Sequence, residues 1–317
     1  MTPNTIPIIW KRSFPVCMGY DGSFSLSNGG IAMMELTASD VSALLPRRRA
    51  DAHKGDFGKL LLLCGSVGFT GAAFFAAMGA LRSGAGLVYL GVPQSIYAIE
   101  AVKLNEPVIF PLPESGGMLS MDALPQILEK LPKMDAVLMG PGLGISENTF
   151  SLLKAVLRQA RCPVVVDADG ITLLAGHMDI LRGRASPTIL TPHDGEFARL
   201  FGPAGTDRMA ACREAAKASN SIVLLKGHRT CISDGTRDYR NLTGNPGMAV
   251  GGSGDVLAGI LTSLLGQGLA PLEAAACAAW LHGAAGDLCA RELGQYGMLP
   301  SDLVSALPQL LIKAGCN

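Results

Sequence analysis

The chain has little charge and no excess of either sign. Lys plus Arg and Asp plus Glu each number 26 among the 317 residues, so the formal net charge at pH 7 is zero. Proteins that bind nucleic acids or membrane surfaces usually carry a basic patch, so this balance argues against both kinds of partner. Only 16% of the residues are charged, and such a surface favours association between copies of the chain.

Paired cysteines and a leader segment are also missing. The eight cysteines are dispersed, with no Cys-x-x-Cys spacing and no pair of histidines nearby, which argues against a zinc site and a disulfide framework. Residues 13–20 do not form the sustained apolar segment of a signal peptide, so we expect a cytoplasmic protein. The uncharged residues 60–81 are interrupted by glycines at positions 65, 68 and 71. They predict a buried strand, a turn and a helix rather than a membrane span.

From residue 35 onward, short apolar runs alternate with helical segments. Runs of this kind are typical of strands that are buried on both faces, as in a parallel sheet covered by helices. We therefore predict an α/β protein, a three-layer α/β/α sandwich with a mostly parallel central sheet. The expected strands are residues 59–64, 87–90, 136–139, 164–167, 188–190, 222–225, 230–233 and 238–241, and the expected helices are 38–45, 72–83, 122–131, 147–159, 195–201, 208–218, 256–265 and 272–292.

The first 33 residues differ from the rest of the chain. They contain three prolines, a Ser/Gly-rich stretch and no periodic apolar face. We expect residues 1–33 to be a loosely ordered extension. No linker rich in proline or serine divides the remainder, so residues 34–317 are expected to form a single domain.

The most informative segment is the glycine-rich stretch at residues 245–259, Asn-Pro-Gly-Met-Ala-Val-Gly-Gly-Ser-Gly-Asp-Val-Leu-Ala-Gly. Its turn leads into an apolar helix, and unpaired amides at a helix start form a site for phosphate. Asp255 would repel a phosphate there, unless it accepts the proton of a group that attacks the phosphate. The alternative is that Asp255 only belongs to the first helical turn, where the helix dipole stabilises it.

Five other unusual segments follow predicted strands. They are residues 65–73, 140–144, 167–170, 191–196 and 226–230. Ligands of such sheets bind where the carboxyl ends of the strands lead into loops, so these segments together predict a nucleotide site. The chain has no Gly-x-x-x-x-Gly-Lys-Ser/Thr motif, which excludes a P-loop NTPase.

Seven segments in this order resemble the ADP-dependent NAD(P)H-hydrate dehydratases, a branch of the ribokinase-like superfamily. They are residues 53–59, 65–73, 140–144, 167–170, 190–196, 225–227 and 245–259. The resemblance implies a ribokinase-like fold and a lyase that dehydrates hydrated NADH or NADPH, consuming ADP and releasing AMP and phosphate. It also implies Mg²⁺, without a dedicated cage of protein ligands, and a homotetramer. In many organisms this domain is fused to an epimerase domain; since nothing before Glu35 resembles one, we expect the dehydratase activity alone.

The resemblance also implies roles for individual residues. Asp255 would be the catalytic base beside the hydroxyl of the substrate, and Gly251, Gly252, Ser253 and Gly254 would form the anion hole. The hydrated dinucleotide, NADHX or NADPHX, would contact Ala72, Gly142, His193 and Asp255. ADP would be held by Lys226, Gly227, His228, Arg229, Thr230 and Gly254. No residue is assigned as a metal ligand.

The residues alone leave several alternatives open. His193 can be a structural histidine, and Lys226 can be a solvated lysine at a strand end. Asp167 and Asp169 can contact magnesium or ribose, but we favour a role in capping the helix that follows. Cys64, Cys277 and Trp280 are expected in the core. For the whole protein, the alternatives are a ribokinase-like kinase acting on a thiazole or pyrimidine alcohol, and a nucleotide sensor without turnover.

Overall fold

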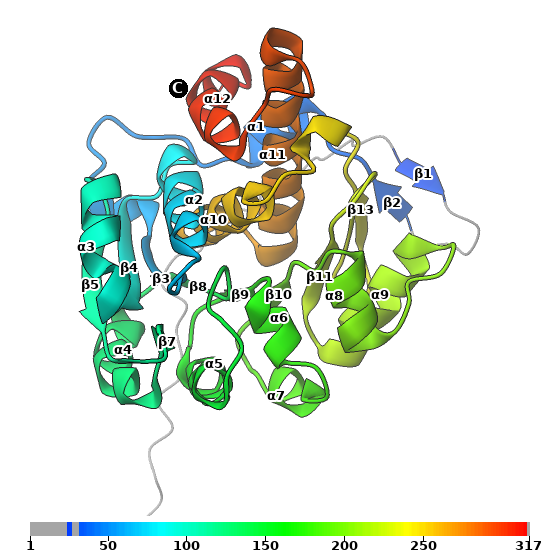
Figure 1. Cartoon of the computed structure of the whole chain (residues 1–317). Coiled ribbons are helices and arrows are strands. Elements are labelled where there is room, and N and C mark those ends of the chain that lie inside the picture. The colour runs from blue at the N-terminus through cyan, green and yellow to red at the C-terminus, as the bar shows by residue number, and fades with distance from the viewer. Residues whose placement is uncertain (1–23, 27–31, 316–317) are drawn as a thin grey trace, which may run out of the picture.

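The structure is a computed structural model that describes residues 24–26 and 32–315. Its centre is a sheet of eleven strands in the order β1-β2-β13-β12-β11-β10-β9-β8-β3-β4-β5 (Figure 1). The strands are β1 (Phe24–Leu26), β2 (Ala32–Met34), β3 (Lys59–Leu63), β4 (Leu87–Pro93), β5 (Val108–Leu112), β8 (Ala136–Met139), β9 (Val164–Val166), β10 (Thr188–Leu190), β11 (Ile222–Leu225), β12 (Cys231–Ser233) and β13 (Asp238–Arg240). A separate hairpin joins β6 (Glu114–Ser115) to β7 (Met118–Leu119).

Most neighbouring strands pair in parallel. Every pair from β11 to β5 is parallel, and so is the pair of β13 with β2. Within the eleven-stranded sheet, the antiparallel pairs are β11 with β12, β12 with β13, and β1 with β2. The predicted mostly parallel sheet is therefore confirmed.

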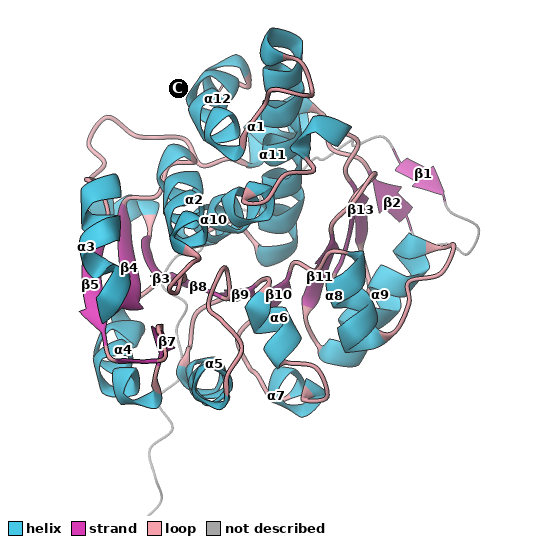
Figure 2. Cartoon of the chain, in the orientation of Figure 1, coloured by secondary structure: helices cyan, strands magenta, loops and turns pink. Residues whose placement is uncertain are grey.

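Helices cover both faces of the sheet (Figure 2). One side carries α1 (Ala38–Leu44), α2 (Thr70–Arg82), α3 (Gln94–Lys103), α10 (Ser253–Gly266), α11 (Pro271–Leu293) and α12 (Pro300–Lys313), with α2 packed along α10. The other side carries α4 (Leu124–Lys130), α5 (Glu147–Gln159), α6 (Asp169–Leu173), α7 (Met178–Arg182), α8 (Asp194–Phe201) and α9 (Arg208–Ser219).

Two apolar cores lie between these three layers, and β3 contributes to both. Leu60 and Leu62 are buried against α2, α10 and α11, whereas Leu61 and Leu63 are buried against the helices of the other face. Successive side chains of a strand point to opposite faces, so an uninterrupted apolar run is required where both faces are covered. This observation confirms the three-layer sandwich.

The strand order reverses between β3 and β8. From β3 the chain continues outward through β4 and β5, and it then returns to place β8 on the other side of β3. The loops after β3 and β8 meet there, because the amide of Gly65 donates to the carbonyl of Pro141 at 2.8 Å. Such a reversal at the carboxyl ends of the strands is where open α/β sheets bind their ligands.

Several observed elements were not predicted. They are the strands β5, β6 and β7 and the helices α3, α6, α7 and α12. Most of the predicted extension, residues 1–33, lies outside the described residues, but β1 and most of β2 fall within it. Because β2 pairs with β13, the sheet begins before the expected domain boundary at residue 34.

Residues 60–81 form β3, a turn and α2, as predicted. Among the described residues, no helix combines the length and the apolar character needed to cross a membrane. Cys64, Cys277 and Trp280 are all buried, which confirms their expected place in the core.

Candidate active site

A cavity of about 890 Å³ lies at the carboxyl edge of the sheet. A volume of this order suits a nucleotide-sized ligand. The cavity is lined by residues 167–168, 193–194, 196, 226–230, 241–246, 248–255, 257, 279 and 282–283. It therefore brings together Asp255, His193 and every residue assigned to the anion hole or to ADP, whereas Ala72 and Gly142 are not part of its lining.

The glycine-rich turn before α10 presents backbone donors to this cavity. Gly252 precedes the helix with a φ of 97°, and a Cβ there would lie 2.8 Å from the ring of Phe75. Among the described residues we find no acceptor for the amides of Gly251, Gly252 and Gly254. The amide of Ser253 is different because it donates to the carbonyl of Val250 at 3.2 Å. Three free amides at a helix start form a site for an anion.

Asp255 lies in the first turn of α10 and is half-buried. Burial raises the pKa of its carboxyl group to about 7; the carboxylate of Asp167 adds to this effect and the ammonium group of Lys226 opposes it. In the described part of the chain, no donor is found for the carboxylate of Asp255. A carboxylate that is unused by the fold and has a pKa near neutrality is suited to accept a proton.

Lys226 follows β11, and its ammonium group lies among acidic side chains. Its Nζ is 2.8 Å from Asp167 Oδ1 and 3.8 Å from Glu196 Oε2. Burial alone would lower the pKa of Lys226, but these two carboxylates outweigh burial and the pKa is raised. Only 18% of the side chain is exposed, so the alternative of a solvated lysine is wrong. A Cβ on Gly254 would lie 3.3 Å from this Nζ, which places a positive charge beside the glycine-rich turn.

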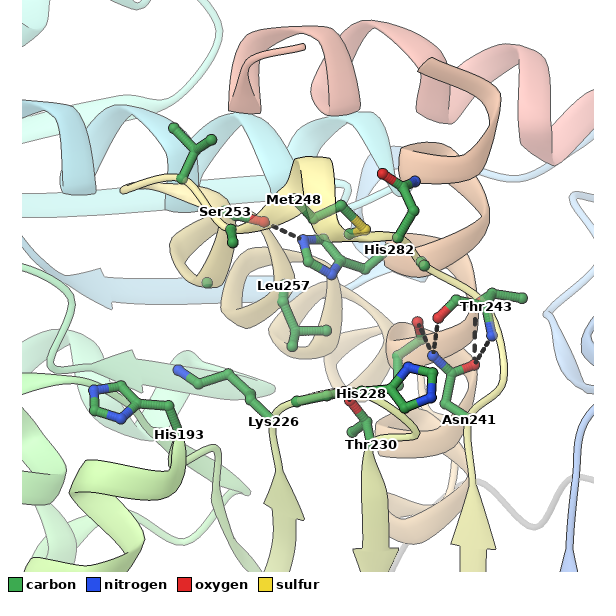
Figure 3. A pocket seen from close by; sticks show the side chains of 18 of the residues that line it. His193, Lys226, His228, Thr230, Asn241, Thr243, Met248, Ser253, Leu257 and His282 are labelled. Atoms are coloured by element: carbon green, nitrogen blue, oxygen red, sulfur yellow. Dashed lines mark hydrogen bonds between the residues drawn. The ribbon is translucent and has the colours of Figure 1, made fainter. Parts of the chain in front are cut away.

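His193 precedes α8 and caps that helix. Its Nδ1 accepts from the amide of Gly195 at 3.0 Å, and the carboxylate of Glu196 accepts from the amide of His193 at 2.8 Å. The imidazole nevertheless remains 60% exposed and borders the cavity together with Lys226 (Figure 3). The structural role is therefore observed, and contact with the substrate stays a prediction.

Asp167 and Asp169 do not cap the helix that follows them, contrary to our expectation. Ala168 is the residue before α6, and no side chain caps that helix. Ala168 has a positive φ of 51°. Asp167 pairs with Lys226, and Asp169 Oδ2 accepts from the amide of Gly144 at 2.9 Å. Tertiary partners therefore replace the local capping hydrogen bond.

Ala72 and Gly142 lie against each other in the region where the strand order reverses. A Cβ on Gly142 would lie 2.8 Å from the Cβ of Ala72 and 2.8 Å from that of Phe69. Ser66 Oγ donates to the carbonyl of Gly142 at 2.8 Å and fixes this contact. The two positions assigned to the dinucleotide are thus adjacent, and their contact with it stays a prediction.

The loop at residues 226–230 depends on a residue that the sequence analysis did not identify. Arg208 donates through Nη2 to the carbonyl of Lys226 at 2.8 Å, and its other terminal nitrogen pairs with Asp194. Within the loop, Arg229 has a φ of 58°. Arg208 lies in α9, and nothing in its local sequence indicates that it contacts this loop.

Three further residues of the cavity region were missed. Asn241 Nδ2 donates to the carbonyl of Ala279 at 3.2 Å, and Asp287 accepts from the amide of Gly244 at 2.9 Å, so both fix the loop after β13 to α11. His282, also in α11, lies 3.2 Å through Nε2 from Ser253 Oγ (Figure 3). The signal that was available is a single histidine within the apolar stretch of residues 274–286.

Comparisons with known proteins identify the family of this chain. The sequence pattern of the NAD(P)H-hydrate dehydratase family matches residues 60–309. A bifunctional NAD(P)H-hydrate repair enzyme of Moorella thermoacetica is 47% identical over 283 residues, which are 87% of this chain and 53% of that enzyme. The chain thus spans about half the length of the bifunctional relatives it matches.

Two relatives are matched over nearly their whole length. An ADP-dependent (S)-NAD(P)H-hydrate dehydratase of Listeria monocytogenes is 31% identical over 88% of this chain and 96% of that protein. The crystal structure of an ADP/ATP-dependent NAD(P)H-hydrate dehydratase from Bacillus subtilis, co-crystallised with ATP and Mg²⁺, superposes with a TM-score of 0.78. It shares 32% identity and covers 88% of this chain and 97% of its own. These matches confirm the resemblance and the ribokinase-like fold: the chain belongs to the NAD(P)H-hydrate dehydratase family.

Proposed function

We propose that this protein is an ADP-dependent NAD(P)H-hydrate dehydratase that repairs hydrated NADH and NADPH. The observation that carries the proposal is the position of Asp255. Its carboxyl group, with a pKa of about 7, lies in the same cavity as the free amides of the glycine-rich turn. A proton acceptor beside a phosphate site is the arrangement that phosphorylation of a hydroxyl group requires.

The proposed reaction has two steps. In the first, the hydroxyl oxygen at C6 of the hydrated nicotinamide ring attacks the β-phosphorus of ADP, Asp255 accepts the hydroxyl proton, and AMP departs. In the second, the C6–O bond breaks and phosphate leaves with the electron pair, while C5 loses a proton and the C5–C6 double bond of the dihydronicotinamide forms. Hydroxide is a poor leaving group and phosphate a good one, so phosphorylation makes the elimination possible.

The residues around Asp255 have separate roles in the first step. The amides of Gly251, Gly252 and Gly254 would hold the transferred phosphoryl group, and the ammonium group of Lys226 would add a positive charge. Lys226 is kept in place by Asp167 at 2.8 Å. The loop at residues 226–230 would hold the rest of the nucleotide. Ala72, Gly142 and His193 would contact the dinucleotide.

Magnesium is part of the proposal, and two acidic side chains fit it: Asp167 lines the cavity, and Asp169 follows two residues later. Mg²⁺ is commonly bound by one or two carboxylates together with substrate phosphates. Asp167 and Asp169 are the residues that would hold it, and both keep one carboxylate oxygen for which no partner is identified among the described residues. When bound, the ion would neutralise charge on the phosphates. No set of three or more ligands is found among the described residues, so the phosphates of ADP would be needed to complete the site.

We also propose ADP as the phosphoryl donor, a homotetramer as the assembly, and the cytoplasm as the location. The Listeria relative is named ADP-dependent, and the low charge of the chain supports self-association. Light scattering on the purified protein measures the oligomeric state directly. ADP and ATP can be compared as donors in the assay that follows.

The decisive experiment incubates the protein with chemically hydrated NADH, ADP and Mg²⁺ and follows the recovery of absorbance by reduced nicotinamide. A dehydratase restores this absorbance and releases AMP and phosphate in equal amounts. A ribokinase-like kinase would instead phosphorylate a thiazole or pyrimidine alcohol and leave the hydrate unchanged. A nucleotide sensor would bind ADP without turning it over, and either result would contradict the proposed function.

A further inference from the structure

The side chains of Ser253 and His282 form a pair at the start of α10. Ser253 is the first residue of α10, and His282 lies in the middle of α11. Their side chains are joined by a contact of 3.2 Å between Oγ and Nε2, and both residues line the cavity (Figure 3). The mechanism above uses neither side chain.

His282 is uncharged at neutral pH. Burial lowers the pKa of its imidazole to about 4; a hydrogen bond with the backbone of Ser253 opposes this effect, and the charge of Lys226 reinforces it. A neutral imidazole carries one proton, and each ring nitrogen is then either a donor or an acceptor. The tautomer of His282 therefore decides the direction of its hydrogen bond with Ser253.

The two directions have opposite effects on an anion in the turn. If Nε2 accepted the hydroxyl proton of Ser253, the oxygen of this residue would present only lone pairs to a phosphate. If Nε2–H donates to Oγ, the hydroxyl proton of Ser253 is free to donate to the phosphate. The backbone amide of Ser253 already donates to the carbonyl of Val250. The hydroxyl group is therefore the donor of Ser253 that remains for a phosphate.

We propose that His282 is a positioning residue for phosphate binding: it donates from Nε2 to Ser253 Oγ and thereby directs the Ser253 hydroxyl proton to the transferable phosphate of the nucleotide. This inference rests on the proposed function and extends its phosphate site from the backbone of the turn to a side-chain pair supplied by two helices.

The test compares the binding of ADP and AMP by calorimetry, because only ADP carries the transferable phosphate. His282→Met removes the donor at similar size, and we expect the affinity for ADP to fall about fivefold to tenfold, as for one hydrogen bond. The affinity for AMP should stay within about twofold. His282→Gln, whose side-chain amide can donate at a similar position, should retain most of the ADP affinity.

A double-mutant cycle separates this role from simple packing. In a Ser253→Ala background the hydroxyl is absent, so adding His282→Met should cost less than about twofold in ADP affinity. His177→Met, at a histidine that stacks on Phe150 outside the cavity, is the matched control and should bind both nucleotides normally. An equal loss of ADP affinity in both backgrounds, or an equal loss for AMP and ADP, would overturn the proposal.

Turnover of hydrated NADH by the unmodified protein is measured in parallel. If the unmodified protein turns over the substrate but His282→Met binds ADP normally, the inference fails and the proposed function stands. If the unmodified protein shows no turnover, but His282→Met loses ADP affinity only when Ser253 is present, the proposed function fails and the positioning role stands. An unmodified protein that binds neither nucleotide overturns both.

Discussion

At the scale of single residues, the chemistry of the site depends on one carboxylate that the fold does not use. Burial and the neighbouring carboxylates raise the pKa of Asp255, and the ammonium group of Lys226 opposes this shift. The same surroundings that suit Asp255 for proton transfer make its charged form costly in the folded state. Function and stability therefore have opposite requirements at this position.

Asp255→Asn should remove activity and preserve the fold. It keeps the shape of the side chain but not the proton acceptor, so turnover should fall by about 10² to 10⁴, the usual contribution of a general base. ADP binding should persist or strengthen, because a negative charge beside the phosphates is removed. Steady-state kinetics and calorimetry test both expectations, and near-normal turnover would contradict the catalytic assignment.

The pH dependence of Asp255 has a definite sign. Its pKa is about 7 in the folded chain, against an ordinary value of 3.8. The folded state therefore binds this proton more tightly, and the contribution of Asp255 to stability falls as the pH rises from about 4 to about 7. Over the same range the base becomes active, so kcat/KM should rise toward a plateau above about pH 7. In Asp255→Asn the free energy of unfolding should fall less between about pH 4 and pH 7 than in the unmodified protein. Denaturant titrations of both proteins at several pH values measure this difference.

Lys226→Met should weaken both the nucleotide site and the fold. It leaves the buried carboxylate of Asp167 without its ion-pair partner, and breaking a buried pair in this way costs about 3 kcal/mol. The KM for ADP should rise far more than the KM for the hydrate, because the ammonium group lies beside the glycine-rich turn. The control is Lys226→Met combined with Asp167→Asn, which should recover much of the stability but not the ADP affinity. Unchanged dependence on ADP would return Lys226 to a purely structural role.

At the scale of elements, the glycine-rich turn is held by the packing of α10 against α2. A Cβ on Gly79 of α2 would lie 2.5 Å from the carbonyl of Val256, and one on Gly259 of α10 would lie 2.9 Å from the amide of Ala80. The two helices thus approach with their backbones nearly in contact. Since Asp255 lies in the first turn of α10, the spacing of these helices sets the position of its carboxylate.

Gly259→Ala should therefore affect both stability and turnover. The added methyl group forces α10 away from α2, and overpacking of this kind costs about 1–3 kcal/mol. Gly183→Ala is the matched control, because its nearest atom would be 3.5 Å away, and it should be close to neutral. Thermal unfolding and kcat provide the two measurements, and a Gly259→Ala protein with unchanged values would show that the helices can adjust without moving the turn.

At the scale of the whole molecule, residues near the start of the chain complete the sheet beside the cavity. Met33 and Met34 of β2 pair with Asp238 and Tyr239 of β13, and Glu35 pairs with Arg240. The cavity-lining loop begins at Asn241, directly after β13. The start of the described chain is thus connected to the cavity through one strand.

Shortened chains can test this connection. We expect a chain that begins at Glu35 to melt several degrees lower than one that begins at Ala32, because β13 loses its parallel neighbour. Its KM for ADP should also rise, since Asn241 and the following loop depend on the position of β13. Equal melting temperatures and equal kinetics would instead support the expectation that residues 1–33 are only a loosely ordered extension.

The sequence by itself determined the layers of the fold and the position of the glycine-rich turn before α10. Apolar runs such as residues 60–63 need cover on both faces, and this local requirement predicts the parallel sheet without further information. The motif at residues 245–259 likewise predicts an anion site, because its glycines and the helix that follows are adjacent in the chain. Signals of this kind are contained in one short segment.

The tertiary structure alone decided which residues meet across the cavity. Asp167 pairs with Lys226, 59 residues away, instead of capping the helix that follows it, because a buried carboxylate is stabilised more by an ammonium group than by a neutral amide. Arg208 contacts the backbone of Lys226, and His282 contacts Ser253, from helices whose local sequences do not indicate these partners. Side-chain pairs between distant segments depend on how helices pack on the sheet, and that packing is a property of the whole chain.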